Sequence, residues 1–487
     1  MEMYQYTATE LSAMLKEKKC SAVELTNSVL KRIHDVEDKV NAFITVTEDL
    51  ALAKAKEVDE KIAKGEAVSE LAGIPIAIKD NICTKGVATT CASRMLENFV
   101  PPYNATVIDK LNACDYVPLG KVNMDEFAMG SSTETSYFKK TCNPNNLDYV
   151  PGGSSGGSAA CVSAGEAVLS LGSDTGGSIR LPAAYCGVVG LKPTYSSVSR
   201  YGLVAFASSL DQIGPMGRSV SDVAMLYSAI CGRDNRDATS AVREYPNFKA
   251  NLNQDVSGKV IGLPKEYFGD GIAQNIKDAV LSMAKELEKQ GAVLKEISLP
   301  STDYALNAYY IISSAEASSN LARFDGVRYG YRTKEYDGLV DMYEKTRSEG
   351  FGDEVKRRIL LGTFVLSSGY YDAYYKRAKL LQQRIMKEFD DEFKNCDLIL
   401  TPIAPDTAFK LGENIGDPLK MYATDICTTT VNIAGLPAIS IPCGRDEKNL
   451  PIGVQLIGPK FSEQTLLNTA YAYEQLVGGF NSIPEVK

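Results

Sequence analysis

Two stretches rich in glycine and serine, PGGSSGGS at 151–158 and GSDTGGS at 172–178, decide how this sequence folds. Their small residues leave space around several hydroxyl and backbone N–H groups. Such a pattern is typical of a nucleophile beside an anion-stabilising pocket. His34 is the only histidine among the 487 residues. Serine chemistry here must therefore do without the usual base, unless His34 is brought in from the N-terminal region.

The overall composition is that of a globular protein with an acidic surface. Hydrophobic residues make up 44% of the chain, and the formal net charge is -9. A chain this acidic is not expected to hold nucleic acid by itself, because phosphate binding needs a basic face. The N-terminus has no basic, apolar leader pattern, and no uncharged apolar run is long enough to cross a membrane. We therefore expect a cytoplasmic protein.

The eleven cysteines do not form a recognisable metal site. None belongs to a C-x-x-C pair, and no cluster of histidines accompanies them. This spacing argues against structural zinc and favours buried, reduced thiols. No metal site is predicted.

Short β-branched runs alternate with helical patterns from Gly73 onward, which indicates an α/β fold. The run GIPIAIKD at 73–80 reads as a buried strand that delivers Lys79 and Asp80 at its end. We predict one domain over residues 1–487. It divides into an N-terminal helical region (1–65), a catalytic core (66–300), a helical excursion rich in Tyr, Lys, Arg and Glu (302–395), and a return to the core (396–487).

Familiar motifs do not account for the first glycine-rich stretch. Residues 152–156 match G-x-S-x-G, the nucleophile elbow of α/β-hydrolases, but that fold needs a histidine after the serine. Walker A requires a lysine after its last glycine, and Ser158 follows Gly157 here. A purely structural Gly/Ser loop remains an alternative, which the second cluster makes less attractive.

Lysine is the remaining candidate base. Ser-Lys pairs are known variants of the serine triad, and burial at the end of an apolar strand would favour the neutral amine of Lys79. Taken alone, a lysine at a strand end is more often a solvated cap. The combination with two serine-rich loops favours the catalytic interpretation.

GIPIAIKD, PGGSSGGSAA and GSDTGGSIRLPAAYCGVVGLKPT, in this order and spacing, resemble the amidase signature family over nearly the whole chain. The resemblance implies a large mixed β-sheet covered on both faces by helices. It also implies a Ser-Ser-Lys triad with Ser178 as nucleophile, Ser154 as the bridging serine and Lys79 as the base. In the family a cis peptide bond usually precedes the bridging serine, which places it at Gly153-Ser154.

The same resemblance implies an oxyanion pocket in the second loop. Its donors would be backbone N–H groups, those of Thr175, Gly176, Gly177 and Ser178. Cys161 and Ser163 stand where relatives often have alanine, and we expect them to affect packing only.

Two further segments, KVNMDEFAMGSSTETS at 121–136 and AEASSNLARFDGVRYG at 315–330, resemble one branch of the family. This branch comprises the A subunits of glutamyl-tRNA(Gln)/aspartyl-tRNA(Asn) amidotransferases, which hydrolyse glutamine. The resemblance implies that Arg358 holds the α-carboxylate of glutamine and Asp425 its α-ammonium. A planar guanidinium suits a carboxylate. Arg358 could instead be a solvated charge, and Asp425 a helix N-cap.

The resemblance also implies partners. Ammonia would pass to a B subunit, which uses ATP and magnesium and contacts the tRNA, while a small C subunit braces the pair; this chain would bind no cofactor itself. Whether the product is Gln-tRNA(Gln), Asn-tRNA(Asn) or both stays open. One alternative is a free-standing amidase that acts on fatty, aryl or peptide amides. Another is an inactive scaffold protein.

Overall fold

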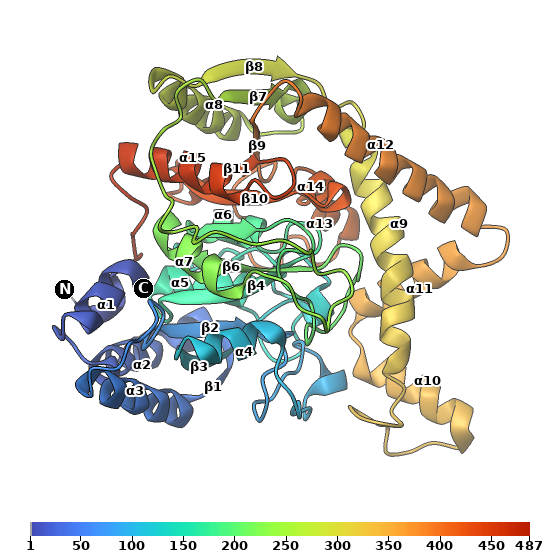
Figure 1. The fold of residues 1–487 in the computed structure, drawn as a ribbon. Helices are drawn as coiled ribbons and strands as arrows, with labels where there is room; N and C mark the ends of the chain where they lie inside the picture. Colours follow the sequence, from blue (N-terminus) through green and yellow to red (C-terminus); the bar gives the residue numbers. More distant parts are fainter. Residues whose placement is uncertain (1) are drawn as a thin grey trace.

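A mixed β-sheet of eleven strands forms the centre of the protein in the computed structural model, which describes residues 2–487 (Figure 1). The strands are β1 (Phe43–Val46), β2 (Pro75–Lys79), β3 (Val117–Val122), β4 (Leu169–Asp174), β5 (Val189–Lys192), β6 (Gln212–Gly217), β7 (Val260–Pro264), β8 (Val293–Ile297), β9 (Leu398–Pro402), β10 (Ala438–Arg445) and β11 (Pro451–Ile457). Their order in the sheet is β1-β3-β2-β4-β6-β5-β10-β11-β9-β7-β8. Strand β2 runs parallel to β3 and β4, whereas β10 and β11 are antiparallel. The predicted α/β class with a large mixed sheet is confirmed.

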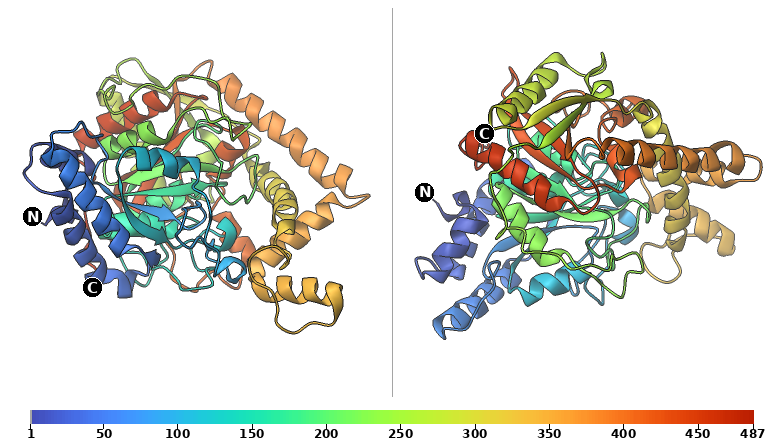
Figure 2. Two further views of the ribbon diagram at one scale, coloured as in Figure 1. Left: turned by 60° about the horizontal axis from the view of Figure 1, so that its bottom comes forward. Right: turned by 45° about the horizontal axis from the view of Figure 1, so that its top comes forward.

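Helices cover both faces of this sheet (Figure 2). The α-helices of residues 2–487 are α1 (Ala8–Lys16), α2 (Ala22–Val40), α3 (Glu48–Ala63), α4 (Thr106–Ala113), α5 (Gly156–Ala164), α6 (Arg180–Cys186), α7 (Val220–Ile230), α8 (Gln274–Lys289), α9 (Thr302–Asn320), α10 (Gly338–Gly350), α11 (Asp353–Leu366), α12 (Lys376–Glu392), α13 (Pro418–Ala423), α14 (Thr429–Ala434) and α15 (Glu463–Leu476). Helix α4 connects β2 to β3, and α5 connects β3 to β4 on the other side of β2. Crossovers between parallel strands are right-handed as a rule, and these two run in opposite directions, so α4 and α5 are expected on opposite faces of the sheet.

The predicted helical excursion forms one side of the molecule (Figure 1). Helices α9, α10, α11 and α12 occupy it, with a π-helical turn at Tyr371–Tyr375 before α12. Helix α9 packs against α11, α12 and α14. Helix α11 packs chiefly against α9. No helix within residues 2–487 has the length and apolar character needed to cross a membrane.

The N-terminal region is mostly helical, with one strand that the sequence did not indicate. At the start of α2, Ser21 Oγ accepts a hydrogen bond from Glu24 N at 3.0 Å, and Glu24 Oε2 accepts from Ser21 N at 2.8 Å, as expected for a capping box. Strand β1 (Phe-Ile-Thr-Val) pairs antiparallel with β3 at the sheet edge. A run of four residues is too short for its pattern to distinguish a strand from a helix end.

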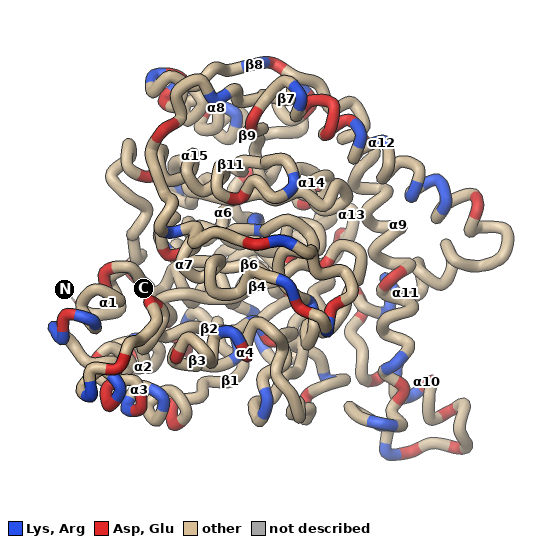
Figure 3. The backbone as a smooth tube through the Cα atoms, viewed as in Figure 1, with Lys and Arg blue, Asp and Glu red and all other residues tan. Residues whose placement is uncertain are grey.

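Buried apolar side chains form a continuous core from Ala8 to Phe480. Such a core is what the single domain predicted for residues 1–487 requires, although the domain boundaries themselves stay a prediction. Charged residues of both signs alternate along outer helices such as α2 and α3 (Figure 3). The core includes Cys161 on α5, whereas Ser163 on the same helix donates to the Cys186 carbonyl at 2.8 Å. Both therefore have the packing role expected of them.

Candidate active site

Strand β2 ends on Lys79, and its side chain is fully buried beneath the serine-rich loops. Its Nζ donates to Ser154 Oγ at 2.7 Å and to Ser155 Oγ at 2.8 Å. It also donates to Ser173, to Oγ at 3.0 Å and to the carbonyl oxygen at 3.2 Å. The alternative of a solvated strand cap is therefore wrong, because the amine reaches only protein groups.

Burial determines the charge of this amine. The loss of solvent lowers the pKa of Lys79 to about 7, although the nearby carboxylates of Asp125, Asp174 and Asp211 act in the opposite direction. An ordinary lysine stays protonated well above neutral pH. At pH 7 and above, a substantial fraction of Lys79 is therefore neutral and able to accept a proton.

Ser154 and Ser155 stand immediately before helix α5. The Gly153-Ser154 peptide bond is cis, as the resemblance implies. A Cβ atom at position 153 would collide with the carboxylate of Asp125, so only glycine fits there. The loop thus presents the Ser154 hydroxyl directly to Lys79.

Ser178 lies in the turn between β4 and α6 with 7% of its surface exposed. Its carbonyl oxygen accepts from Ser155 N at 3.1 Å, which joins the two glycine-rich loops. Its hydroxyl makes no hydrogen bond to any residue of 2–487, so it can rotate toward Ser154 or toward a substrate. The structure therefore brings Lys79 and Ser154 into direct contact and holds Ser178 beside them.

Asp174 shapes the loop in which the oxyanion donors were expected. Its Oδ1 accepts from Gly177 N at 2.8 Å and its Oδ2 from Ile179 N at 3.1 Å. The Gly177 N–H is thus already engaged. The N–H groups of Thr175, Gly176 and Ser178 have no partner among the described residues, which leaves these three as candidate oxyanion donors.

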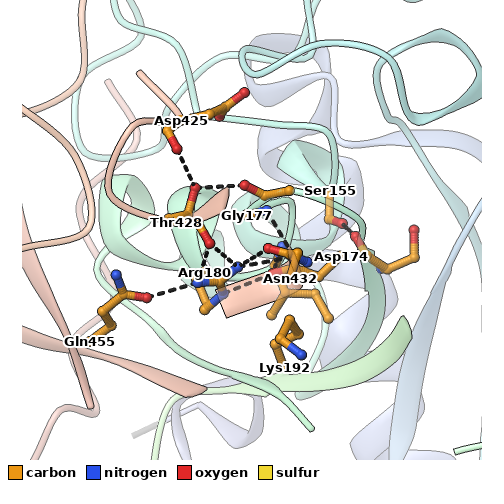
Figure 4. Close-up of polar contacts among 12 residues, drawn as sticks. Ser155, Asp174, Gly177, Arg180, Lys192, Asp425, Thr428, Asn432 and Gln455 are labelled. Atoms are coloured by element: carbon orange, nitrogen blue, oxygen red, sulfur yellow. Dashed lines mark hydrogen bonds and ion pairs between the residues drawn. The ribbon is translucent and has the colours of Figure 1, made fainter. Parts of the chain in front are cut away.

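A buried ion pair supports this loop from below (Figure 4). Arg180 Nε lies 3.1 Å from Asp174 Oδ2, and both side chains are fully buried. The guanidinium also donates to Gln455 Oε1 at 2.8 Å and to Asn432 Oδ1 at 2.6 Å. Although burial alone would raise the pKa of Asp174, the charge and hydrogen bonds of Arg180 hold it at about 2. Asp174 is therefore a permanent anion that fixes the Ser178 turn.

Thr428 connects the serine loop with the segment that carries Asp425 (Figure 4). Its hydroxyl lies 2.6 Å from the Gly176 carbonyl oxygen and 3.1 Å from the Asp425 carbonyl oxygen. The Arg180 guanidinium donates to the carbonyl oxygen of Thr428 as well. The nucleophile turn and the segment between α13 and α14 are therefore held in fixed register.

Arg358 and Asp425, predicted to hold the two charges of an amino acid, are both buried. Arg358 lies on α11 with 3% of its surface exposed, and Asp425 lies between α13 and α14 with 8% exposed. Tyr310 contacts both: the Arg358 guanidinium carbon lies 4.4 Å from its ring centroid, and its hydroxyl donates to Asp425 Oδ2 at 3.1 Å. Arg358 is therefore not a solvated charge. Ser131 Oγ also donates to Asp425, at 3.0 and 2.8 Å from its two oxygens, so this carboxylate does not act as a helix cap.

Burial gives Asp425 an unusual ionisation. Loss of solvent raises the pKa of its carboxyl to about 7, despite the hydroxyls of Ser131 and Tyr310 and the positive charge of Arg358. A cationic group bound beside it would favour the ionised form. Arg358 itself stays positively charged: burial lowers the pKa of its guanidinium, but the surrounding tyrosines and Glu354 outweigh this and raise it.

A cavity of about 270 Å³ lies against Arg358, and Ser131, which donates to Asp425, also lines it. Arg358, Glu354 and Tyr422 line one side of it, and Ser131 and Ser132 line the side toward the serine loops. A Cβ at Gly153 would lie 2.6 Å from Ser132 N, which shows how closely this wall approaches the Ser154 loop. The volume suits a small molecule of amino-acid size.

Several residues of the site were not indicated by the sequence. Tyr310 lies in a helical run rich in alanine and serine, where an aromatic residue normally indicates core packing. Ser131 belongs to a segment used only for the resemblance, and Asp174 and Arg180 lie within the signature stretch without a distinct pattern of their own. Their roles depend on contacts between distant parts of the chain.

Other candidate groups are placed away from this chemistry. The His34 side chain is 62% exposed on α2, with Nε2 3.3 Å from Glu48 Oε2, so it cannot serve as a base for Ser178. All eleven cysteines are unpaired. Within residues 2–487, no group of three or more His, Cys, Asp or Glu side chains is placed to hold a metal ion.

The comparisons with known proteins extend over the whole chain. The family model described as Amidase matches residues 24–467. A curated relative from Desulforamulus reducens, the A subunit of glutamyl-tRNA(Gln) amidotransferase, is 57% identical over 475 residues, which cover 98% of both chains. The crystal structure of the same-named protein from Thermotoga maritima is 43% identical, with a TM-score of 0.83 over 100% of this chain and 99% of that one. The peptide amidase of Stenotrophomonas maltophilia is 28% identical, with a TM-score of 0.82 over 99% and 98%. The chain therefore belongs to the amidase family.

Proposed function

We propose that this chain is the glutamine-hydrolysing A subunit of a tRNA-dependent amidotransferase. Its reaction releases ammonia from the side-chain amide of glutamine. The ammonia then converts Glu-tRNA(Gln) to Gln-tRNA(Gln), and its use on Asp-tRNA(Asn) stays open. The end-to-end similarity to curated proteins of this name supports the proposal.

One observation favours glutamine over other amides as the substrate. A buried cation, Arg358, and a buried carboxyl, Asp425, contact the same tyrosine beside the serine loops. Buried charges are costly unless they are paired. A free amino acid carries one charge of each sign, so its carboxylate could bind the terminal nitrogens of Arg358 and its ammonium could pair with Asp425, whereas an apolar amide offers neither charge.

In the proposed acylation, Ser178 Oγ attacks the carbonyl carbon of the glutamine side chain. The Ser178 proton moves to Ser154 Oγ while the Ser154 proton moves to neutral Lys79 Nζ. The C–N bond then breaks, and the nitrogen takes a proton back along the same route and leaves as ammonia. A glutamyl ester remains on Ser178, and water activated by the same pair hydrolyses it to glutamate.

The developing oxyanion would be met by the N–H groups of Thr175, Gly176 and Ser178. Such fixed donors stabilise the transition state more than the ground state. Gly177 contributes differently from the other loop residues: its N–H holds Asp174 and thereby keeps the turn in shape.

The remaining steps would fall to partner subunits. We place ATP, magnesium and most tRNA contacts on a B subunit that receives the ammonia, with a small C subunit bracing the pair. The acidity of this chain fits that division, because a formal charge of -9 disfavours direct contact with tRNA phosphates.

Substrate choice tests this proposal. Glutamine hydrolysis should depend on Ser178 and should rise when the chain is assembled with its B and C subunits and tRNA. The matched comparison uses the isolated chain with hexanamide, an apolar amide of similar length. Efficient hydrolysis of hexanamide by the isolated chain, with no glutaminase activity in the assembled complex, would show a free-standing amidase instead.

A further inference from the structure

Glu354 occupies a central position in the wall that carries Arg358. It lies one helical turn before Arg358 on α11, and its side chain is only 13% exposed. Its Oε1 accepts from Arg358 Nε at 2.7 Å and from Tyr422 Oη at 2.7 Å. One carboxylate oxygen thus joins the arginine of α11 to a tyrosine of α13.

We infer that Glu354 is a positioning residue that selects substrates with a free α-carboxylate. It acts through Arg358 and Tyr422 and does not touch the reacting atoms. The inference rests on the proposed glutaminase function and adds to it the group that orients the substrate-binding arginine.

The contacts of Arg358 define which part of its guanidinium is available. Glu354 takes the Nε edge, and the guanidinium carbon lies 4.4 Å and 4.8 Å from the ring centroids of Tyr310 and Tyr422. The two rings stack at 4.0 Å. The buried Nη1 has no hydrogen-bond partner among the described residues. With Nε and the flat face occupied, the terminal nitrogens remain for a carboxylate.

The ion pairs of Glu354 leave Arg358 able to pair with a carboxylate ligand. The other oxygen of Glu354 pairs with Arg357, so one carboxylate is shared by two guanidinium groups. These three side chains together keep one net positive charge, and the carboxylates of Glu126, Glu134 and Asp353 also line the cavity. A ligand carboxylate can pair with that charge without displacing Glu354.

Glu354 also connects to the residue proposed for the ammonium. Tyr422 lies near the end of α13, directly before the segment with Asp425, and Tyr310 joins Arg358 to Asp425. Release of Tyr422 from Glu354 would free α13 at the cavity wall. Loss of Glu354 should therefore allow both Arg358, proposed to hold the α-carboxylate, and Asp425, proposed to hold the α-ammonium, to move.

Two opposing effects decide the outcome of Glu354→Gln. Removal of the negative charge increases the attraction of the arginines for a carboxylate, whereas loss of a charged hydrogen-bond partner lets Arg358 and Tyr422 move. Because Arg358 is almost fully buried, we expect the loss of orientation to dominate. A hydrogen bond to a charged group corresponds to about 10- to 100-fold in an equilibrium, so KM for glutamine should rise in this range.

The test measures glutamine hydrolysis by the assembled complex. Glu354→Gln should raise KM about 10- to 100-fold while kcat falls less than about 3-fold. Tyr422→Phe removes only one hydroxyl and should raise KM less. The matched control is Glu349→Gln on α10, where the carboxylate also accepts from a tyrosine, Tyr331, but does not line the cavity. Its KM should equal that of the native complex.

Crystal structures of Glu354→Gln and of the more severe Glu354→Ala give a readout that does not depend on glutamine. Displacement of Arg358 and Tyr422 from their stacked positions in Glu354→Ala supports the positioning role, even if the native complex proves inactive on glutamine and the proposed function fails. An unchanged Arg358 in Glu354→Ala, or an unchanged or lower KM in Glu354→Gln, overturns the inference and leaves the glutaminase proposal intact.

Discussion

The two halves of the site are built in different ways. The half proposed to be catalytic consists of Lys79, Ser154 and Ser178, which lie at or next to the ends of central elements. The charged half consists of Arg358 and Asp425, which come from an outer helix and an inter-helix segment. Contacts with tyrosines and with Glu354, and not hydrogen bonds of the sheet, hold this charged half together. Under the proposed function, the residues that make and break bonds are held by the sheet, whereas the residues that choose the substrate are held by packing between outer elements.

Removal of the proposed nucleophile should have the largest effect on activity. Ser178→Ala should lower glutaminase kcat by about 10⁴-fold or more, since the covalent route is lost while the oxyanion donors remain. The assay is ammonia release by the assembled complex. Glutamine binding, measured by calorimetry, should change little because the charged half is intact. Retention of turnover with a trapped acyl-enzyme would refute the role of Ser178.

Replacement of the base should have a smaller effect on rate and a distinctive effect on stability. Lys79→Met should lower kcat by about 10²- to 10⁴-fold, the range for loss of a general base. Lys79→Arg should be equally impaired, because a guanidinium stays protonated. Near-native activity of Lys79→Arg would rule out the neutral base.

The stability of Lys79→Met follows from the sign of the pKa shift. The pKa of Lys79 is lowered to about 7 in the folded chain, so between pH 7 and 10.5 the unfolded chain binds more protons than the folded one. The native free energy of unfolding should therefore rise with pH relative to Lys79→Met, by about 1.4 kcal/mol per pH unit. Denaturant unfolding at several pH values measures this difference, and a constant difference would contradict the shift.

Much of the catalytic half could be predicted from the sequence. A short apolar strand ending in Lys79, and glycines around Ser154 and Ser178, are local patterns with a direct physical meaning. The contact between Lys79 and Ser154 connects residues far apart in the chain, and it followed only from the resemblance. The engagement of the Gly177 N–H by Asp174 was not foreseen, because backbone donors look alike in a sequence.

In the charged half, only Arg358 and Asp425 could be predicted from the sequence. Arg358 was expected from the resemblance, but its contacts with Tyr310 and Glu354 depend on how α9, α11 and α13 pack. A tyrosine in a helix gives no signal that separates core packing from a ligand site. Strand β1 was missed for a related reason, since its partner β3 is distant in sequence.

Changes in the charged half should affect binding more than rate. Arg358→Lys keeps the charge but loses the planar fork, so KM for glutamine should rise about 10- to 100-fold with little change in kcat. Asp425→Asn should act similarly through the ammonium. Steady-state kinetics separate the two parameters. A selective fall in kcat would instead assign these residues to the chemical step.

The pH dependence should distinguish the two halves within one enzyme. Both Lys79 and Asp425 have a pKa of about 7, and the proposed mechanism requires the deprotonated form of each. In free enzyme both protonate as pH falls, so log kcat/KM should decline below pH 7 with a slope approaching two. A bound ammonium keeps Asp425 ionised, so log kcat should decline with a slope of one. Equal slopes would show that only one of the two groups matters.

The smallest effect is expected at His34. Replacement of this residue tests which group causes the decline in activity below pH 7, the acid limb of the pH profile. Histidine ordinarily titrates near neutral pH, so a decline below pH 7 would usually be assigned to it. His34 is the only histidine, and its side chain is exposed beside Glu48, away from the serine loops. His34→Gln should change stability by less than about 0.5 kcal/mol and leave kcat and its pH profile unchanged. If the acid limb disappeared in His34→Gln, the titrating group would be histidine, and the assignment of the limb to Lys79 would be wrong.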